Sequence, residues 1–214
     1  AGTGTIALFQ LRNLCDPDRA NKCVRSLLEL YARGGWIPEA SEGIEYNATM
    51  ASSYAIAMMG AAFQQGIRDY DTSMMYKAIV HDRTVPGVPH AGGGFAGAGY
   101  LDSYIKSGSV TGVTDSAAAT SEYAFIDFAT SQMAKVSSNI SDYKTFTKRA
   151  FSYGNLTCHD NRYLSVFAPH DVSGIINTFG RETFIDRLEK SIEGSLRHVE
   201  PGKITPDMIR QIRY

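Results

Sequence analysis

The segment from Asp115 to Val136, DSAAATSEYAFIDFATSQMAKV, is the feature that most constrains the fold of this chain. Its spacing predicts a helix, in which the only lysine is Lys135 and the interior carboxylates are Glu122 and Asp127. A surface helix keeps a wide charged stripe facing water. A helix this poor in charge is therefore expected to have other helices on most of its sides.

Other segments also show helical spacing, and few show the alternation of a strand. A second helix that is nearly free of charge is predicted at residues 48–67, where small residues let neighbouring backbones approach closely. More amphipathic helices are predicted at 18–33, 69–85, 101–106, 140–157, 168–180 and 181–194. This alternation predicts an all-α chain, a single helical domain over residues 1–214 with two layers of helices, as in an (α/α) toroid.

Composition excludes several functions. The net charge of -1 on 214 residues gives no electrostatic argument for nucleic acid, and no apolar run reaches the roughly 20 residues that span a bilayer. The glycine-rich stretch 85–100 lacks the pattern of a phosphate loop and is expected to be a flexible connection or a turn-rich lid. The histidines His81, His90, His159 and His198 lack metal-site spacing, so no metal site is predicted.

The three cysteines, Cys15, Cys23 and Cys158, show no CxxC pair and no metal-finger spacing. Their odd number fits either one disulfide with a free thiol or three buried thiols. We favour buried thiols, because unpaired cysteine is commonly a small core residue.

Three Asn-X-Ser/Thr sequons occur, at Asn47, Asn139 and Asn155. About one is expected by chance in a chain with few asparagines, so three lean towards a secreted glycoprotein, and coincidence is the alternative. We therefore predict a secreted or extracellular location.

Six segments then occur in a recognisable order: PDRANKCVRSLLELYARGGWIP, QQGIRDYD, YKAIVHD, SEYAFIDFATSQMAK, YKTFTKRAFSYGNL and PHDVSGIINTFGRETFIDRLEKSIE. From about Thr5 to Glu193 the chain resembles glycoside hydrolase family 92, the calcium-dependent exo-α-mannosidases. The resemblance implies an (α/α)6 toroid beside a β-sandwich domain. It also implies hydrolysis with inversion, in which a carboxylic acid protonates the leaving oxygen and a carboxylate activates water, while calcium helps to bind the terminal mannose.

The chain departs from the family pattern at the segments that carry this chemistry. The stretch before Pro169-His170-Asp171 contains no glutamate where the family has its acid in Thr-Glu-Gly-Asn. The family's Asn-Glu-Pro-x-His calcium segment and its Gly-Asp-Glu-Asp base segment do not follow Glu193, where a divergent tail occupies 195–214. The family's Gly-Asp-His falls at Ser52-Ser53-Tyr54. We therefore expect a truncated or degenerate member, a partial toroid that holds no cofactor of its own and binds calcium only if its site is completed elsewhere.

Some polar residues keep the family pattern. Glu122, Asp127 and Asp171 are the candidate catalytic residues, and Trp36, His170 and Asp171 are the candidates for substrate binding. A structural role competes with each: buried carboxylates accept hydrogen bonds from loop backbone or arginine, and Asp171 fits the cap of a helix after Pro169. Because Glu122 and Asp127 are five residues apart, they diverge by about 140° and do not form one paired site on their helix.

Three functions follow from the resemblance. The favoured one is an α-mannosidase-like domain that lacks self-sufficient catalysis and acts as a structural or interaction subunit. A second is a piece of an active enzyme whose acid, base and calcium segments lie in other sequence or another chain. A third is a lectin-like module that uses some of the 12 Tyr and 10 Phe to stack on a mannose-containing glycan, although these residues also fill a helical core. Exposed flanks of inner helices would bind a protein partner or a second copy of the chain.

Overall fold

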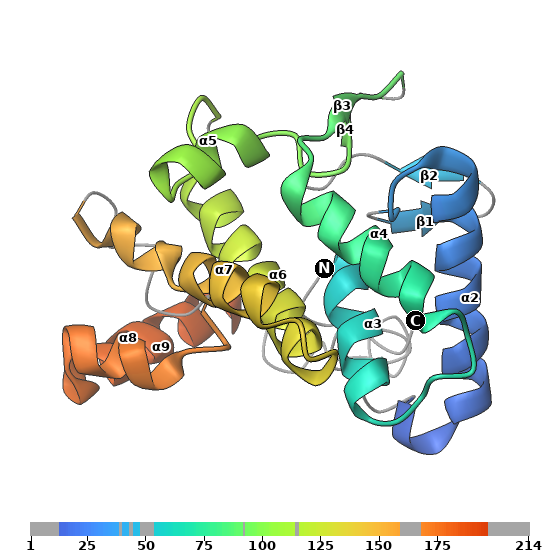
Figure 1. The fold of residues 1–214 in the computed structure, drawn as a ribbon. Coiled ribbons are helices and arrows are strands. Elements are labelled where there is room, and N and C mark those ends of the chain that lie inside the picture. Colours follow the sequence, from blue (N-terminus) through green and yellow to red (C-terminus); the bar gives the residue numbers. More distant parts are fainter. Residues whose placement is uncertain are drawn as a thin grey trace. The chain divides into compact units, whose positions relative to one another are not determined.

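The computed structural model describes residues 13–38, 40–42, 45–47, 54–91, 93–113, 116–158 and 168–196. The chain divides into two compact units, Ala1–Asp160 and Asn161–Tyr214. The elements of the first unit are α2 (Pro17–Gly34), β1 (Ala40–Glu42), β2 (Glu45–Asn47), α3 (Tyr54–Gln64), α4 (Thr72–Thr84), β3 (Val88–Pro89), β4 (Phe95–Ala96), α5 (Leu101–Ser107), α6 (Ser116–Val136), α7 (Ile140–Ala150) and the 3-10 helix η1 (Ser152–Cys158) (Figure 1). In this described part no strand exceeds three residues, which confirms the all-α prediction.

Helix α2 begins and ends where its sequence signals predict. The side chain of Asp16 caps the helix by accepting from the backbone N of Arg19 at 3.0 Å, and Pro17 occupies the first turn, where its missing N–H costs nothing. Gly35 ends the helix in the left-handed conformation, with φ 79°. The buried face then carries Ala20, Val24 and Leu28.

Helix α3 is the described part of the second uncharged helix, and residues 48–53 of that prediction lie outside the described residues. Eight of its 11 residues are buried, as expected for an inner helix. It approaches α6 closely at Gly60, because a Cβ there would lie only 3.4 Å from the Met133 side chain. The helix ends before Ile67, at a turn in which Gly66 has φ 84°.

Helix α6 lies at the centre of the first unit. It runs along α7 and α3 and also contacts α4 and η1, so neighbours cover several of its sides (Figure 1). This confirms that its low charge reflects burial. Its buried residues are Ala119, Thr120, Ser121, Tyr123, Ala124, Ile126, Asp127, Thr130, Ser131, Met133 and Ala134. The predicted helix over 140–157 divides instead into α7 and η1, two helices that both contact α6.

The glycine-rich stretch contains a short hairpin. Strands β3 and β4 pair antiparallel, with Val88 opposite Ala96 and Pro89 opposite Phe95. The turn between them includes Gly93 and Gly94, whose φ values of 92° and 68° are rare for residues with a side chain. The described part of this stretch therefore contains a short paired hairpin with a glycine-rich turn.

The second unit contains α8 (Val172–Phe179) and α9 (Arg181–Leu196), which contact each other. Asp171 caps α8, since its side chain accepts a hydrogen bond from the backbone N of Gly174 at 2.9 Å. This confirms the prediction that Asp171 caps a helix after Pro169. Among the described helices of both units, none combines the length and apolar character required to cross a membrane.

The prediction of buried thiols is wrong for two cysteines. Cys15 is exposed and Cys23 is half-buried, and the two do not form a disulfide. Cys15 precedes the cap of α2, and Cys23 lies at the edge of the face that buries Val24. The side chain of Cys158 lies outside the described residues.

Candidate functional site

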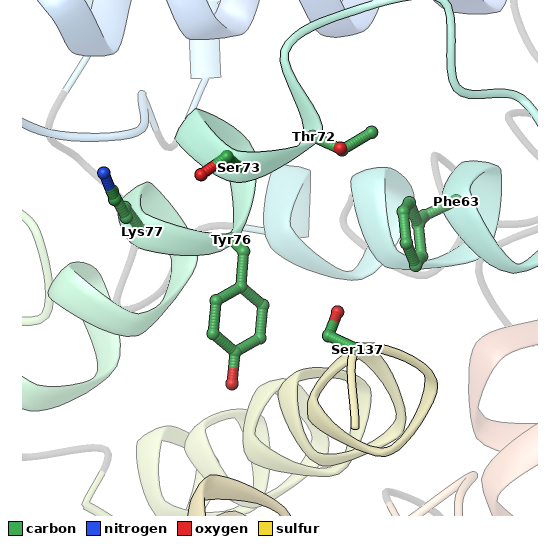
Figure 2. Close-up of a pocket in the computed structure, with 6 residues that line it drawn as sticks. All are labelled: Phe63, Thr72, Ser73, Tyr76, Lys77 and Ser137. Atoms are coloured by element: carbon green, nitrogen blue, oxygen red, sulfur yellow. The ribbon is translucent and has the colours of Figure 1, made fainter. Parts of the chain in front are cut away.

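A pocket of about 290 Å³ opens beside α3, α4 and the end of α6 (Figure 2). Its walls are Phe63, Thr72, Ser73, Tyr76, Lys77 and Ser137. None of these residues is acidic, and glycoside hydrolysis usually requires a pair of carboxyl groups. The candidate carboxylates of α6 therefore belong to other surroundings.

The two carboxylates of α6 face different neighbours. Glu122 lies against α3, where Tyr54 hydrogen-bonds to it. Asp127 instead lies against α4 and α7, where it pairs with Arg83 and Arg149. The five-residue spacing indicated this divergence, and the two groups have different neighbours.

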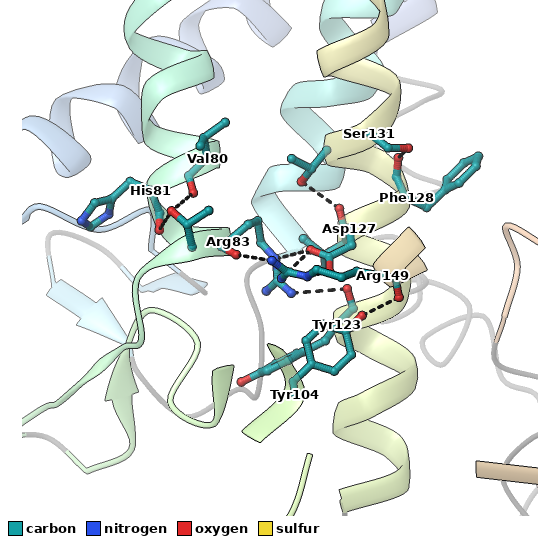
Figure 3. A network of polar contacts seen from close by, with 12 residues as sticks. Val80, His81, Arg83, Tyr104, Tyr123, Asp127, Phe128, Ser131 and Arg149 are labelled. Carbon is teal, nitrogen blue, oxygen red and sulfur yellow. Dashed lines mark hydrogen bonds and ion pairs between the residues drawn. The ribbon is translucent and has the colours of Figure 1, made fainter. Parts of the chain in front are cut away.

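Asp127 is held by two arginines (Figure 3). Arg83 Nε donates to its Oδ1 at 2.8 Å, and Arg149 Nη2 donates to the same oxygen at 3.1 Å. Arg149 Nε lies 2.7 Å from the other oxygen, Oδ2. The side chains of Asp127, Arg83 and Arg149 are 0%, 1% and 13% exposed. Through these contacts the buried Asp127 carboxylate connects α6 with α4 and α7.

Two tyrosines complete the cluster. Arg83 lies 4.9 Å from the ring centre of Tyr123, and Arg149 lies 5.3 Å from that of Tyr104. The Tyr104 hydroxyl donates to the backbone O of Arg149 at 2.8 Å. Arg149 Nη1 in turn donates to the backbone O of Arg83 at 2.8 Å. We call Arg83, Tyr104, Tyr123, Asp127 and Arg149 the Asp127 cluster.

The charges of the Asp127 cluster do not cancel. Two guanidinium groups share one carboxylate, and arginine remains charged in proteins. Burial lowers the pKa of Arg149; Asp127 opposes this effect, and the positive Arg83 adds to it. The cluster therefore carries one surplus positive charge, and Arg149 is its most exposed member.

The surroundings of Glu122 differ. Burial raises the pKa of this carboxyl group, and the hydrogen bond from Tyr54 partly opposes the shift. Its Oε2 is buried and has no hydrogen-bond partner among the described residues. A raised pKa favours the protonated form that a general acid requires, and burial has the same effect on glutamates in structural positions.

Trp36 lies in a cluster of rings beside the α2–β1 connection. Its ring centre is 4.6 Å from that of His81, and His81 in turn meets Tyr31 edge-on at 6.1 Å. The Trp36 ring also lies against the backbone of Gly97. These are packing contacts, and they account for the position of Trp36 without a bound sugar.

Asp82 fixes the backbone next to Trp36. Its Oδ2 accepts from the backbone N of Ile37 at 3.1 Å, and its Oδ1 lies 3.4 Å from His81 Nδ1. Burial raises the pKa of Asp82 to about 8, which the Ile37 hydrogen bond and the charge of Arg83 only partly oppose. In the folded chain at pH 7 this raised pKa favours the protonated form of Asp82, while in the unfolded chain Asp82 is ionised.

This difference predicts that stability falls as pH rises. Between the unfolded pKa near 3.8 and the folded pKa near 8 the folded state binds more protons, so the free energy of unfolding decreases with pH. We expect a fall on the order of 1 kcal/mol per pH unit between pH 5 and 7, and no further fall from this group well above pH 8. Urea unfolding of the wild type and of Asp82→Asn, which resembles the protonated acid, measures the effect. Equal pH slopes in the two proteins would contradict it.

His170 and Asp171 lie in the second unit and are both half-buried. Asp171 caps α8, and His170 directly precedes it. The sequence pattern identified both, and the geometry assigns a helix-capping role to Asp171.

The sequons fall on different kinds of position. Asn139 caps α7, with its Oδ1 accepting from the backbone N of Asp142 at 3.2 Å and its Nδ2 donating to the Asp142 carboxylate at 2.9 Å. Asn155 is exposed, and its Nδ2 donates to the backbone O of Gly108 at 3.3 Å. Asn47 is in β2, and its side chain lies outside the described residues. Glycosylation at these positions stays a prediction.

The described residues do not fit a calcium site. Among them no three His, Cys, Asp or Glu side chains gather closely enough to hold a metal ion. Calcium takes six to eight oxygen ligands, whereas the carboxylates of Asp127 and Asp171 are held by arginines and by a helix end. No step of a reaction is therefore assigned to calcium in this chain.

Comparison with solved structures identifies the fold. An inverting mannosidase of family GH92 from Bacteroides thetaiotaomicron matches with TM-score 0.72 and 20% identity, over 81% of this chain and 27% of that one. A second match is an α-mannosidase of the same family and organism, solved with mannoimidazole. Its TM-score is 0.74 and its identity 20%, over 86% of this chain and 28% of that one. The structure of the same α-mannosidase without that ligand matches with TM-score 0.73 and 22% identity, over 85% of this chain and 28% of that one. The chain thus has the helical, (α/α)6-toroid type of fold of these structures, and it spans little more than a quarter of the matched chains.

The model of the glycosyl hydrolase family 92 catalytic domain matches residues 6–165. The chain belongs to this family, as the six sequence segments predicted. No curated protein matches the chain.

The sequence identified the carboxylates but not their partners. Arg83 and Arg149 are 44 and 22 residues from Asp127 along the chain. Each is in the last turn of a helix, where a basic residue usually faces solvent and complements the helix dipole. The only indication of these partners in the sequence was that a carboxylate in a charge-poor helix requires a partner.

Proposed function

We propose that this chain is an α-mannosidase-like glycoside hydrolase domain that acts as a structural or interaction subunit and lacks catalysis of its own. The observation that carries the proposal is that the candidate carboxylates already have structural roles. Asp127 joins three helices, Asp171 caps α8, and Glu122 bonds to Tyr54. Hydrolysis with inversion requires two carboxyl groups roughly 6.5–9.5 Å apart that flank one sugar bond. The divergence of Glu122 and Asp127 on α6 does not provide such a pair.

A second candidate function rests on Glu122. Its raised pKa and its unpartnered Oε2 favour a domain that contributes one acid to a site completed by other sequence or by another chain. In that arrangement the base and the oxygen ligands of calcium would also come from elsewhere. The chain spans only 27–28% of the family mannosidases it matches, which leaves room for such contributions.

A protein partner or a second copy of the chain belongs to both proposals, because an inner helix is covered on all sides only when its layer is complete. A lectin-like function has weaker support, since the contacts of Trp36 are with protein groups. The three sequons support a secreted location.

The proposal predicts that the purified 214-residue chain releases no mannose from α-mannobiosides, with calcium or with a chelator. Circular dichroism establishes that the assayed chain is helical, and an active family 92 α-mannosidase serves as the positive control.

Calcium-dependent release that Glu122→Gln abolishes would overturn the first proposal, because it would show that the isolated chain contains a working site in which Glu122 takes part. The matched control is Glu29→Gln, which removes an exposed glutamate of α2 and leaves α6 unchanged.

A further inference from the structure

A larger pocket lies where the ends of α5 and α7 meet η1. Its volume is about 640 Å³. Its walls are Tyr104, Ile105, Lys106, Ser107, Gly108, Thr145, Lys148, Arg149, Phe151, Ser152 and Asn155. Three of these residues are basic and none is acidic, which is uncommon in a chain whose net charge is -1. This pocket is distinct from the surroundings of Glu122 and from the Trp36 rings.

The basic groups of the pocket come from two helices. Lys106 is in the last turn of α5, and Lys148 and Arg149 are in the last turn of α7. The two lysines are exposed, and neither has an acidic partner among the described residues. The C-terminal end of a helix carries about half a negative charge. The positive charge of the two lysines therefore exceeds the negative charge of the two C-terminal ends.

Arg149 connects the pocket with the Asp127 cluster. It lies on the pocket wall, while its guanidinium group shares Asp127 with Arg83. Because one carboxylate faces two guanidinium groups, the surplus positive charge of the cluster lies directly behind this wall. A negative group in the pocket would offset that charge at close range, where screening by salt is weak.

We propose that this pocket binds an oxyanion, a phosphate or sulfate group that is free or attached to a small molecule. Lys106 and Lys148 donate charge-assisted hydrogen bonds to its oxygens from opposite helices, and Arg149 supplies positive potential from the wall. Ser152 and Asn155 also line the pocket and add polar side chains to it. The site lies outside the sugar chemistry of the family and does not depend on whether the chain hydrolyses mannosides.

Isothermal titration calorimetry at constant ionic strength tests the proposal, with inorganic phosphate, inorganic sulfate and glycerol phosphate as probes and sodium chloride as the background salt. Saturable binding of at least one probe is expected. Lys106→Gln with Lys148→Gln should weaken that binding at least about tenfold, because two charge-assisted hydrogen bonds are lost. Both positions are exposed, and circular dichroism checks that the variant folds.

The charge-matched control is Lys22→Gln with Arg33→Gln, which removes two exposed basic groups of α2. Its affinity should stay within about twofold of the wild type, because charges beyond the screening length contribute little. If glycerol phosphate binds more tightly than inorganic phosphate, the ligand is a phosphate ester. If the two bind with similar affinity, the ligand is a free ion. Absence of saturable binding for all three probes, or equal weakening in both double variants, would overturn the proposal.

Discussion

Asp127→Ala is expected to lower the free energy of unfolding by about 3–5 kcal/mol, the typical cost of removing one partner from a buried ion pair. The change leaves Arg83 and Arg149 buried without a carboxylate, so their mutual repulsion and their desolvation are no longer offset. Urea unfolding followed by circular dichroism measures the loss.

Two variants make this prediction specific. Asp102→Asn removes an exposed carboxylate of α5 and should leave stability nearly unchanged. The triple variant Arg83→Met, Asp127→Leu, Arg149→Met removes the charges together and should recover most of the loss, because packed apolar groups often replace a buried ion cluster at little cost. A loss below about 1 kcal/mol for Asp127→Ala would show that the cluster is not a source of stability.

Gly97→Ala is expected to destabilise the chain by about 3 kcal/mol. Gly97 has φ 78°, a conformation that is strained for alanine, and its added Cβ would collide with the Trp36 ring. The ring must move, and Trp36 is the only tryptophan of the chain. A shift of the fluorescence emission should therefore accompany the loss of stability.

Gly66→Ala separates the two causes of this effect. Gly66 has a similar φ of 84°, but a Cβ there would meet no atom within 4 Å. This control should lose only about 1 kcal/mol through backbone strain and should keep the emission of the wild type. Equal losses for the two variants would mean that the contact with Trp36 contributes nothing.

The helices of this chain were predictable because their signals are local. Asp16, Pro17 and Gly35 mark the ends of α2 within a few residues, and the low charge of α6 indicates its burial. The cap role of Asp171 followed from the same kind of local pattern. The hairpin of β3 and β4 was not predicted, because its two-residue strands are too short to show an alternating pattern.

The site was predictable only in part. The sequence singled out Asp127 but not the two arginines that hold it, because an ion pair across 44 residues leaves no periodic trace. The buried state of Asp82 was also missed, since the segment His81-Asp82-Arg83 reads as the polar end of a helix. Family resemblance singled out the candidate residues, and the structure shows that Asp127 and Asp171 make contacts that hold helices in place.

The Asp127 cluster also determines how α6 is rotated about its own axis. Asp127 bonds to α4 on one side and to α7 on another, and a rotation of the helix by one residue, about 100°, would break both connections. Glu122 belongs to the same rigid helix, so its direction is fixed by contacts five residues away. The orientation of Glu122 is thus set by two arginines that bind another residue of the same helix.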